Sequence, residues 1–200
     1  MRKYLSLIPA AVLLLSGCQA RPPAKAEAAA QPQFHVDATI KDIMDSIVDP
    51  EADVIWNSVA TIVSATGIEE RAPKTDEDWA TLRRSAIQLI EATNLLRIPG
   101  RQVAKPGEKS QNPHIELEPG AIERLIADDP ATWKQLIDGL HDAAAPALKV
   151  IESKSVEGLY DVGDKMEAAC ENCHRHYWYP PGTAPIWKVD EGLRKGSVRP

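Results

Sequence analysis

Three residues near the C-terminus have the spacing of a cofactor attachment site. Cys170, Cys173 and His174 lie in the sequence Cys-Glu-Asn-Cys-His. On a helix, positions i, i+3 and i+4 share one face, so both thiols and the adjacent imidazole would point the same way. Two thiols at this spacing can form thioether bonds to the two vinyl groups of one haem, while the histidine ligates its iron. The motif therefore predicts one covalently attached haem c, held by these three residues.

Three other interpretations of the Cys-x-x-Cys pair remain open. A redox-active pair of the thioredoxin type normally opens a helix after a strand, whereas this pair lies near the end of a predicted helix. Half of a zinc site would need further ligands, and residues 19–200 contain no second Cys pair. The third is a structural disulfide in a lipoprotein adaptor without haem. A secretory signal favours haem, because bacteria attach haem c outside the cytoplasm.

The N-terminus has the features of a lipoprotein signal. Two basic residues precede an apolar stretch, Leu5–Leu15, which is too short to cross a membrane as a helix. The stretch ends in Leu-Ser-Gly-Cys, which resembles a bacterial lipobox, with cleavage before Cys18 and lipidation of its thiol. We therefore expect a signal peptide over residues 1–17 and membrane attachment through lipid alone. Gln19 is similar to an outer-membrane sorting signal, which favours the periplasmic side of the outer membrane.

The composition is that of an acidic, globular protein. The 200 residues carry a net charge of -6, and removal of residues 1–17, with two positive charges, makes it -8. This balance argues against a nucleic-acid partner and would steer a basic redox partner protein. Aromatic residues are only 5% of the chain, which favours helices over a β-sandwich. No nucleophile–base constellation or nucleotide-binding loop appears, so the sequence does not predict an enzyme.

Helical periodicity predicts the elements that would position the motif. Apolar residues recur at three- and four-residue intervals over segments 39–64, 75–98, 129–152 and 156–178. Pro50 and Pro146 fall inside two of them, and we expect a break or kink at each. Thr75 and Ser155 are predicted N-caps. No segment has a convincing strand pattern, so the sequence predicts an all-α fold, an antiparallel four-helix bundle.

The remaining segments lack this long periodicity. They are expected to be a lipid-anchored tether over 18–36, loops over 67–73 and 98–118, a short helix over 119–127 and an irregular C-terminal tail over 179–200. The predicted globular domain therefore spans residues 37–178.

A predicted four-helix bundle with Cys-x-x-Cys-His near the end of its last helix resembles the cytochrome c-prime family, also called class II c-type cytochromes. Its members are four-helix bundles with Cys-x-x-Cys-His near the end of the last helix, and the resemblance covers residues 37–178. Tyr177 matches a Tyr often found three residues after the haem His, whereas Trp178 and the long loop depart from the family pattern. The resemblance implies single-electron transfer or, alternatively, a five-coordinate haem that binds NO or CO. It also implies a possible homodimer, because relatives often pair through their early helices.

The function depends on the sixth ligand of the iron. Met44 lies early in the first helix, at a position similar to that from which six-coordinate class II cytochromes supply a distal Met. We predict His174 and Met44 as axial ligands, a pair that raises the potential and suits electron transfer. The alternative is that Met44 is only a core residue. Met166 precedes His174 on the same helix and is expected to pack at the haem edge.

Weaker candidates complete the predicted site. Alternative histidine ligands are His35, His114, His141 and His176. Arg101 and Arg175 are candidates for pairing with the haem propionates, although most arginines are simply solvated.

Overall fold

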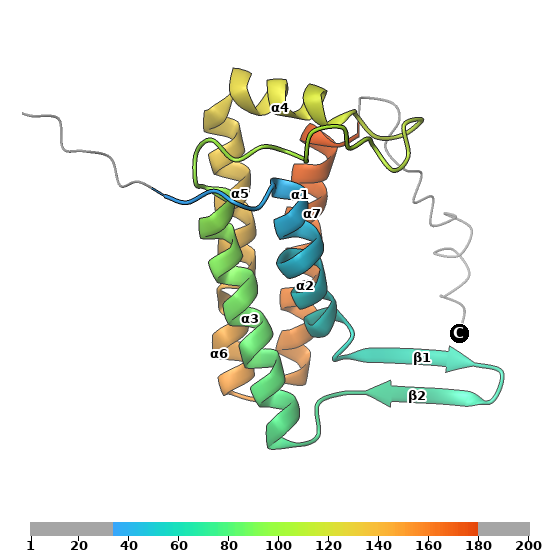
Figure 1. The fold of residues 1–200 in the computed structure, drawn as a ribbon. Coiled ribbons are helices and arrows are strands. Elements are labelled where there is room, and N and C mark those ends of the chain that lie inside the picture. The colour runs from blue at the N-terminus through green and yellow to red at the C-terminus, as the bar shows by residue number, and fades with distance from the viewer. Residues whose placement is uncertain (1–33, 180–200) are drawn as a thin grey trace, which may run out of the picture. The chain divides into compact units, whose positions relative to one another are not determined.

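The computed structural model describes residues 34–179, and these residues are mostly helical (Figure 1). The helices are α1 (Ile40–Ile43), π-helix η1 (Met44–Val48), α2 (Asp49–Trp56), α3 (Asp76–Leu96), α4 (Pro119–Asp128), α5 (Pro130–Ala144), α6 (Pro146–Glu152) and α7 (Val156–Tyr177). The predicted helical class is confirmed in this coarse form. The predicted signal peptide, the lipid site at Cys18, most of the tether and nearly all of the tail lie outside the described residues.

The first helical segment runs without interruption from Ile40 to Trp56. Inside it, the Asp49 N–H donates to the carbonyl of Met44, five residues back, which defines the π turn. Pro50 follows directly. It has no N–H, and its ring would clash with the carbonyl four residues earlier in a regular α-helix. The irregularity predicted near Pro50 thus takes the form of a wider turn at the residue before it.

A β-hairpin corrects the sequence prediction. Residues 60–64 were expected to be helical and 67–73 to be a loop, but β1 (Ala60–Ser64) and β2 (Gly67–Arg71) pair antiparallel, with Val63 opposite Ile68. The run Thr-Ile-Val is β-branched and favours a strand, although its apolar spacing also suits a helix. Gly67 has a φ of 137° at the turn, which a residue with a side chain rarely adopts.

The later helices begin and end where the sequence predicted. Thr75 Oγ1 accepts from the Asp78 N–H at 3.1 Å, and the Asp78 carboxylate accepts from the Thr75 N–H at 2.8 Å, which is a capping box. Ser155 Oγ accepts from the Gly158 N–H at 3.0 Å and caps α7. Pro146 separates α5 from α6, and the segment 98–118 contains neither helix nor strand.

The helical segments pack side by side around a shared apolar core. Helix α7 packs against α5, α6 and α2, and α3 packs against α2, α5 and α6. The hairpin contacts none of the helices of residues 34–179 and projects away from them (Figure 1). Within the same range, no helix is both long and apolar enough to cross a membrane.

One close approach joins the first helical segment to α7. The indole N–H of Trp56 donates to the carbonyl of Gly163 at 3.1 Å. A Cβ at Gly163 would lie 3.2 Å from Trp56 Cδ1, so the absence of a side chain lets the indole lie against the α7 backbone. This contact helps to fix the separation of the two helical segments.

We expect Trp56→Phe to lower the free energy of unfolding by about 1 kcal/mol more than a matched Trp→Phe change, because it removes this hydrogen bond. The control is Trp79→Phe, since the Trp79 indole is buried and has no hydrogen-bond partner within residues 34–179. Denaturant unfolding of the two variants measures the difference. Equal losses would show that the hydrogen bond contributes nothing.

Candidate functional site

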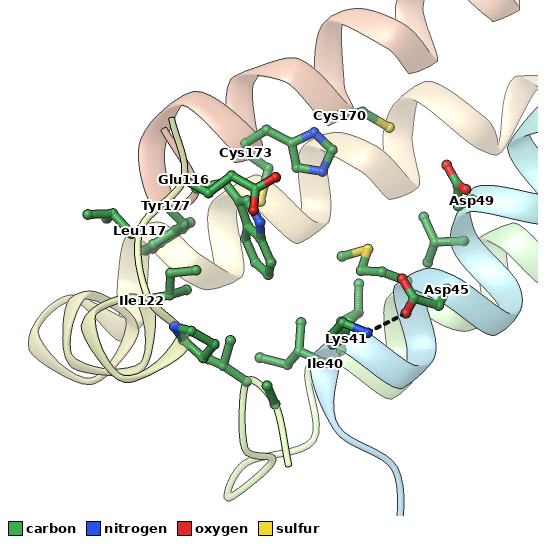
Figure 2. Close-up of a pocket in the computed structure, with 18 of the residues that line it drawn as sticks. Ile40, Lys41, Asp45, Asp49, Glu116, Leu117, Ile122, Cys170, Cys173 and Tyr177 are labelled. Carbon is green, nitrogen blue, oxygen red and sulfur yellow. Dashed lines mark hydrogen bonds and ion pairs between the residues drawn. The ribbon is translucent and has the colours of Figure 1, made fainter. Parts of the chain in front are cut away.

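A cavity of about 300 Å³ lies between α7 and the segment formed by α1, η1 and α2 (Figure 2). Cys170, Cys173 and His174 all line it from α7. The volume is within the range of small-molecule and cofactor sites, and the lining is mostly apolar, as in such sites. The structure therefore brings the three motif residues to one hollow, as their helical spacing predicted.

The two thiols are free and partly buried. Burial raises the pKa of Cys170 to about 11 and that of Cys173 to about 12. The nearby carboxylate of Asp49 raises the pKa of Cys170 further. A redox pair of the thioredoxin type needs lowered thiol pKa values, so this environment does not suit it. The thiols are also not joined in a structural disulfide.

His174 presents a neutral imidazole to the cavity. Burial lowers its pKa, while the carboxylates of Glu171 and Asp49 act in the opposite direction. The ring lies 6.4 Å from that of Trp178 and 6.3 Å from that of Tyr179, measured between centroids. It makes no hydrogen bond to the side chains or backbone of residues 34–179. A neutral imidazole without a competing partner is the form that binds a metal.

Met44 lines the same cavity from the other helical segment and is half-buried. Met166 is fully buried in the core and does not line the cavity, so the prediction that it packs at the haem edge is not supported. Of the four other histidines, His35, His114 and His176 are exposed and His141 is half-buried, and none of them lines the cavity. Within the described residues, Met44 thus lines the same cavity as the Cys-x-x-Cys-His motif, whereas the four alternative histidine ligands do not.

The long loop between α3 and α4 forms another wall of the cavity. Ile40 and Lys41 donate their backbone N–H groups to the carbonyls of Gln102 and Val103 at 2.8 and 2.9 Å. The first N–H groups of a helix have no partner within it, so the loop satisfies them. Further on, the Leu117 N–H donates to the Trp178 carbonyl at 2.8 Å. The loop is therefore joined both to the start of α1 and to the end of α7.

Charged residues at the cavity were missed by the sequence analysis. Lys41 and Lys109 line it, together with the acidic side chains of Asp45, Asp49 and Glu116. Lys41 Nζ lies 2.8 Å from Asp45 Oδ2, and Figure 2 marks this ion pair with a dashed line. No local pattern marks these residues, because the loop brings some of them there only through its contacts with two distant helices.

The two arginines considered for the propionates lie elsewhere. Arg101 donates to the backbone carbonyls of Ala38 and Leu95. Arg175 pairs with Glu171 at 2.7 Å on the exposed side of α7. Neither lines the cavity, so that expectation is not supported by their positions.

Tyr177 leaves a buried polar atom without a partner beside the cavity. The residue is 1% exposed, and its hydroxyl makes no hydrogen bond within residues 34–179. Burial raises its pKa to about 12, so the hydroxyl stays protonated. Its ring packs edge-on against Trp133, with centroids 5.3 Å apart. An unpaired buried hydroxyl is costly, and a cavity-bound group with an acceptor atom would remove that cost.

No family model, curated protein or solved structure matches the chain. The chemistry of the site is therefore indicated by its donor atoms alone. Two thiols at helical spacing, one neutral imidazole and one thioether face an apolar hollow, and this set fits a covalent haem with two axial ligands. Within the described residues, no group of three or more His, Cys, Asp or Glu side chains is arranged to hold one metal ion, as a zinc site requires.

We expect the thiols to react slowly with iodoacetamide in a folded, cofactor-free chain. A pKa raised from 9.0 to about 11 lowers the thiolate fraction of Cys170 roughly 100-fold at any pH well below 9. The measurement is the alkylation rate at pH 8, compared with the same chain in denaturant, with circular dichroism to confirm that the chain is helical. Faster alkylation in the folded chain would indicate an activated redox pair instead.

Proposed function

We propose that the chain is a lipid-anchored, extracytoplasmic monohaem cytochrome, similar to the c-prime family, that transfers single electrons and is not an enzyme. The observation that carries this proposal is that His174 and Met44 line one cavity from two different helical segments. The side-by-side packing of the long helices supports the antiparallel four-helix bundle expected for that family. The periplasmic location and the anchor at Cys18 are supported by the sequence pattern alone.

Each residue of the site has a distinct task in this proposal. Cys170 and Cys173 would hold haem c through two thioether bonds, and His174 and Met44 would be its axial ligands. Haem c supplies one-electron redox chemistry when bound. The chain contributes an imidazole and a thioether, a pair that raises the reduction potential. The apolar lining, including the buried Trp133 and Ile137, limits the access of water to the site.

The charged residues around the cavity would orient the cofactor and its partner. Lys41 and Lys109 are the basic side chains of the lining, and they would face the acidic groups of a haem. The surplus of acidic residues over the chain would attract a basic redox partner, and this attraction would weaken with added salt.

We expect Met44→Leu to convert a low-spin cytochrome into one with an open iron site. In the wild-type protein, the reduced spectrum should be low-spin and unchanged by CO. Leucine matches methionine in volume but has no sulfur to ligate iron, so the variant should become high-spin, bind CO and have a lower reduction potential. Optical spectra with and without CO, together with redox titration, measure these changes.

The matched control is Met166→Leu, because Met166 is fully buried on the motif helix but does not line the cavity. This variant should keep the wild-type spectrum. A wild-type protein that is already high-spin and binds CO would contradict the Met44 assignment and establish the five-coordinate, NO- or CO-binding alternative. Denaturing mass spectrometry that finds no added haem mass would instead support an adaptor lipoprotein.

We expect Tyr177→Phe to lower the stability of the haem-loaded protein but not that of the cofactor-free chain. In the cofactor-free chain it removes an unpaired buried hydroxyl, so the free energy of unfolding should stay the same or rise. In the haem-loaded protein it should fall by about 1 kcal/mol, because the hydroxyl would donate to an acceptor of the cofactor. Denaturant unfolding of both forms measures this, and equal shifts in the two forms would contradict a contact with the cofactor.

A further inference from the structure

The hairpin exposes apolar side chains that nothing in the described domain covers. Val63 is 75% exposed, Ile68 is 70% exposed and Ile62 is 37% exposed. Val63 and Ile68 are directly opposite each other in the register, so they form one apolar pair next to the turn. A two-stranded hairpin that packs on no helix is marginally stable in water, whereas three or more strands with an apolar face are stable. The hairpin would therefore be stabilised by pairing with further strands.

The two edges of the hairpin differ in charge. Strand β1 has the sequence Ala-Thr-Ile-Val-Ser, without a charged residue, a proline or a glycine. Strand β2 carries Glu69, Glu70 and Arg71. Charged residues and prolines are the usual devices that prevent an exposed edge from pairing with another strand. Edge β1 lacks them, so it is open to pairing, and β2 is protected.

We propose that edge β1 is a self-association site, at which it pairs antiparallel with β1 of a second copy of this chain. Pairing about a two-fold axis at Ile62 places each Ile62 opposite its symmetry mate and Thr61 opposite Val63. Every pair is then uncharged, and most members are β-branched, which stabilises cross-strand contacts. The product is a sheet in the order β2-β1-β1-β2, whose Val63–Ile68 pairs from both copies share one face.

Charge and symmetry favour this pairing over the other edge combinations. Pairing of β2 with β2 about Glu69 would place two like charges opposite each other, which is destabilising. Pairing of β1 with β2 is heterologous and leaves a free edge on each copy, so it would continue into an open chain. Pairing of β1 with β1 uses the same patch on both copies and closes as a dimer. The acidic residues beside the apolar pair also disfavour insertion into an anionic membrane.

The expected affinity is low. A five-residue strand pair buries less area than the interfaces of stable protein complexes, so in solution we expect a weak dimer. Attachment of both copies to one membrane would raise their effective concentration and favour the dimer. The pairing itself does not rest on haem binding, because the hairpin residues do not line the cavity.

The test compares Ile62→Lys with Ile68→Lys in the full chain, solubilised in mild detergent. Both changes replace an exposed isoleucine of the hairpin with lysine, but only residue 62 meets its own symmetry mate. Sedimentation equilibrium over a dilution series should show a reversible dimer for the wild type. The dissociation constant should rise about tenfold or more for Ile62→Lys and much less for Ile68→Lys. A wild type that stays monomeric, or equal effects of the two changes, would overturn the proposal.

A second experiment compares the crosslinking rates of two cysteine variants, and this comparison does not depend on the haem content of the protein. Under mild oxidation, Ile62→Cys should form a disulfide-linked dimer much faster than Ile68→Cys. Both variants contain the same native cysteines, so the difference between them reports the β1 edge alone. Equal crosslinking would overturn the proposal, as would hairpin amide protection that appears only on addition of lipid vesicles, which would indicate a membrane as the occupant.

Discussion

The site depends on the geometry of one helix. Because α7 is regular through its last turns, Cys170, Cys173 and His174 lie on one side of it and line the same cavity. This local constraint accounts for only one wall of the cavity. The facing wall comes from the segment Ile40–Trp56, which lies far away in the sequence, and its position relies on contacts such as that of Trp56 with the Gly163 carbonyl. The chemistry is therefore local in origin, and the cavity is a product of tertiary packing.

The features that sequence analysis predicted correctly are those determined by nearby residues. The start of α3 follows from the reciprocal hydrogen bonds of Thr75 and Asp78, and the division at Pro146 follows from the missing N–H of proline. The hairpin was missed because a short β-branched run with apolar spacing is ambiguous between strand and helix. The loop residues at the cavity, such as Lys109, were missed because their position depends on contacts with two helices distant in the sequence.

Burial has one consistent effect on the cavity groups. It raises the pKa values of both thiols and of Tyr177, and it lowers the pKa of His174, so all four side chains are neutral near pH 7. These neutral donors lie in a mostly apolar cavity, and that environment suits a large, mostly apolar cofactor. The hollow and the unpaired Tyr177 hydroxyl both reduce stability when nothing is bound. A bound group that fills the cavity and accepts a hydrogen bond from the Tyr177 hydroxyl would therefore stabilise the folded chain.

The hairpin and the long loop are attached at opposite ends of the first helical segment. The segment begins at Ile40, where the long loop is attached, and it ends at Trp56, just before the strands depart (Figure 1). None of the residues of β1 or β2 lines the cavity. Pairing through β1 would consequently leave the loop and the end of α7 uncovered, so under the proposed function these elements would stay accessible to a redox partner. Self-association and electron transfer would then use separate surfaces, so a dimer could still bind its redox partner.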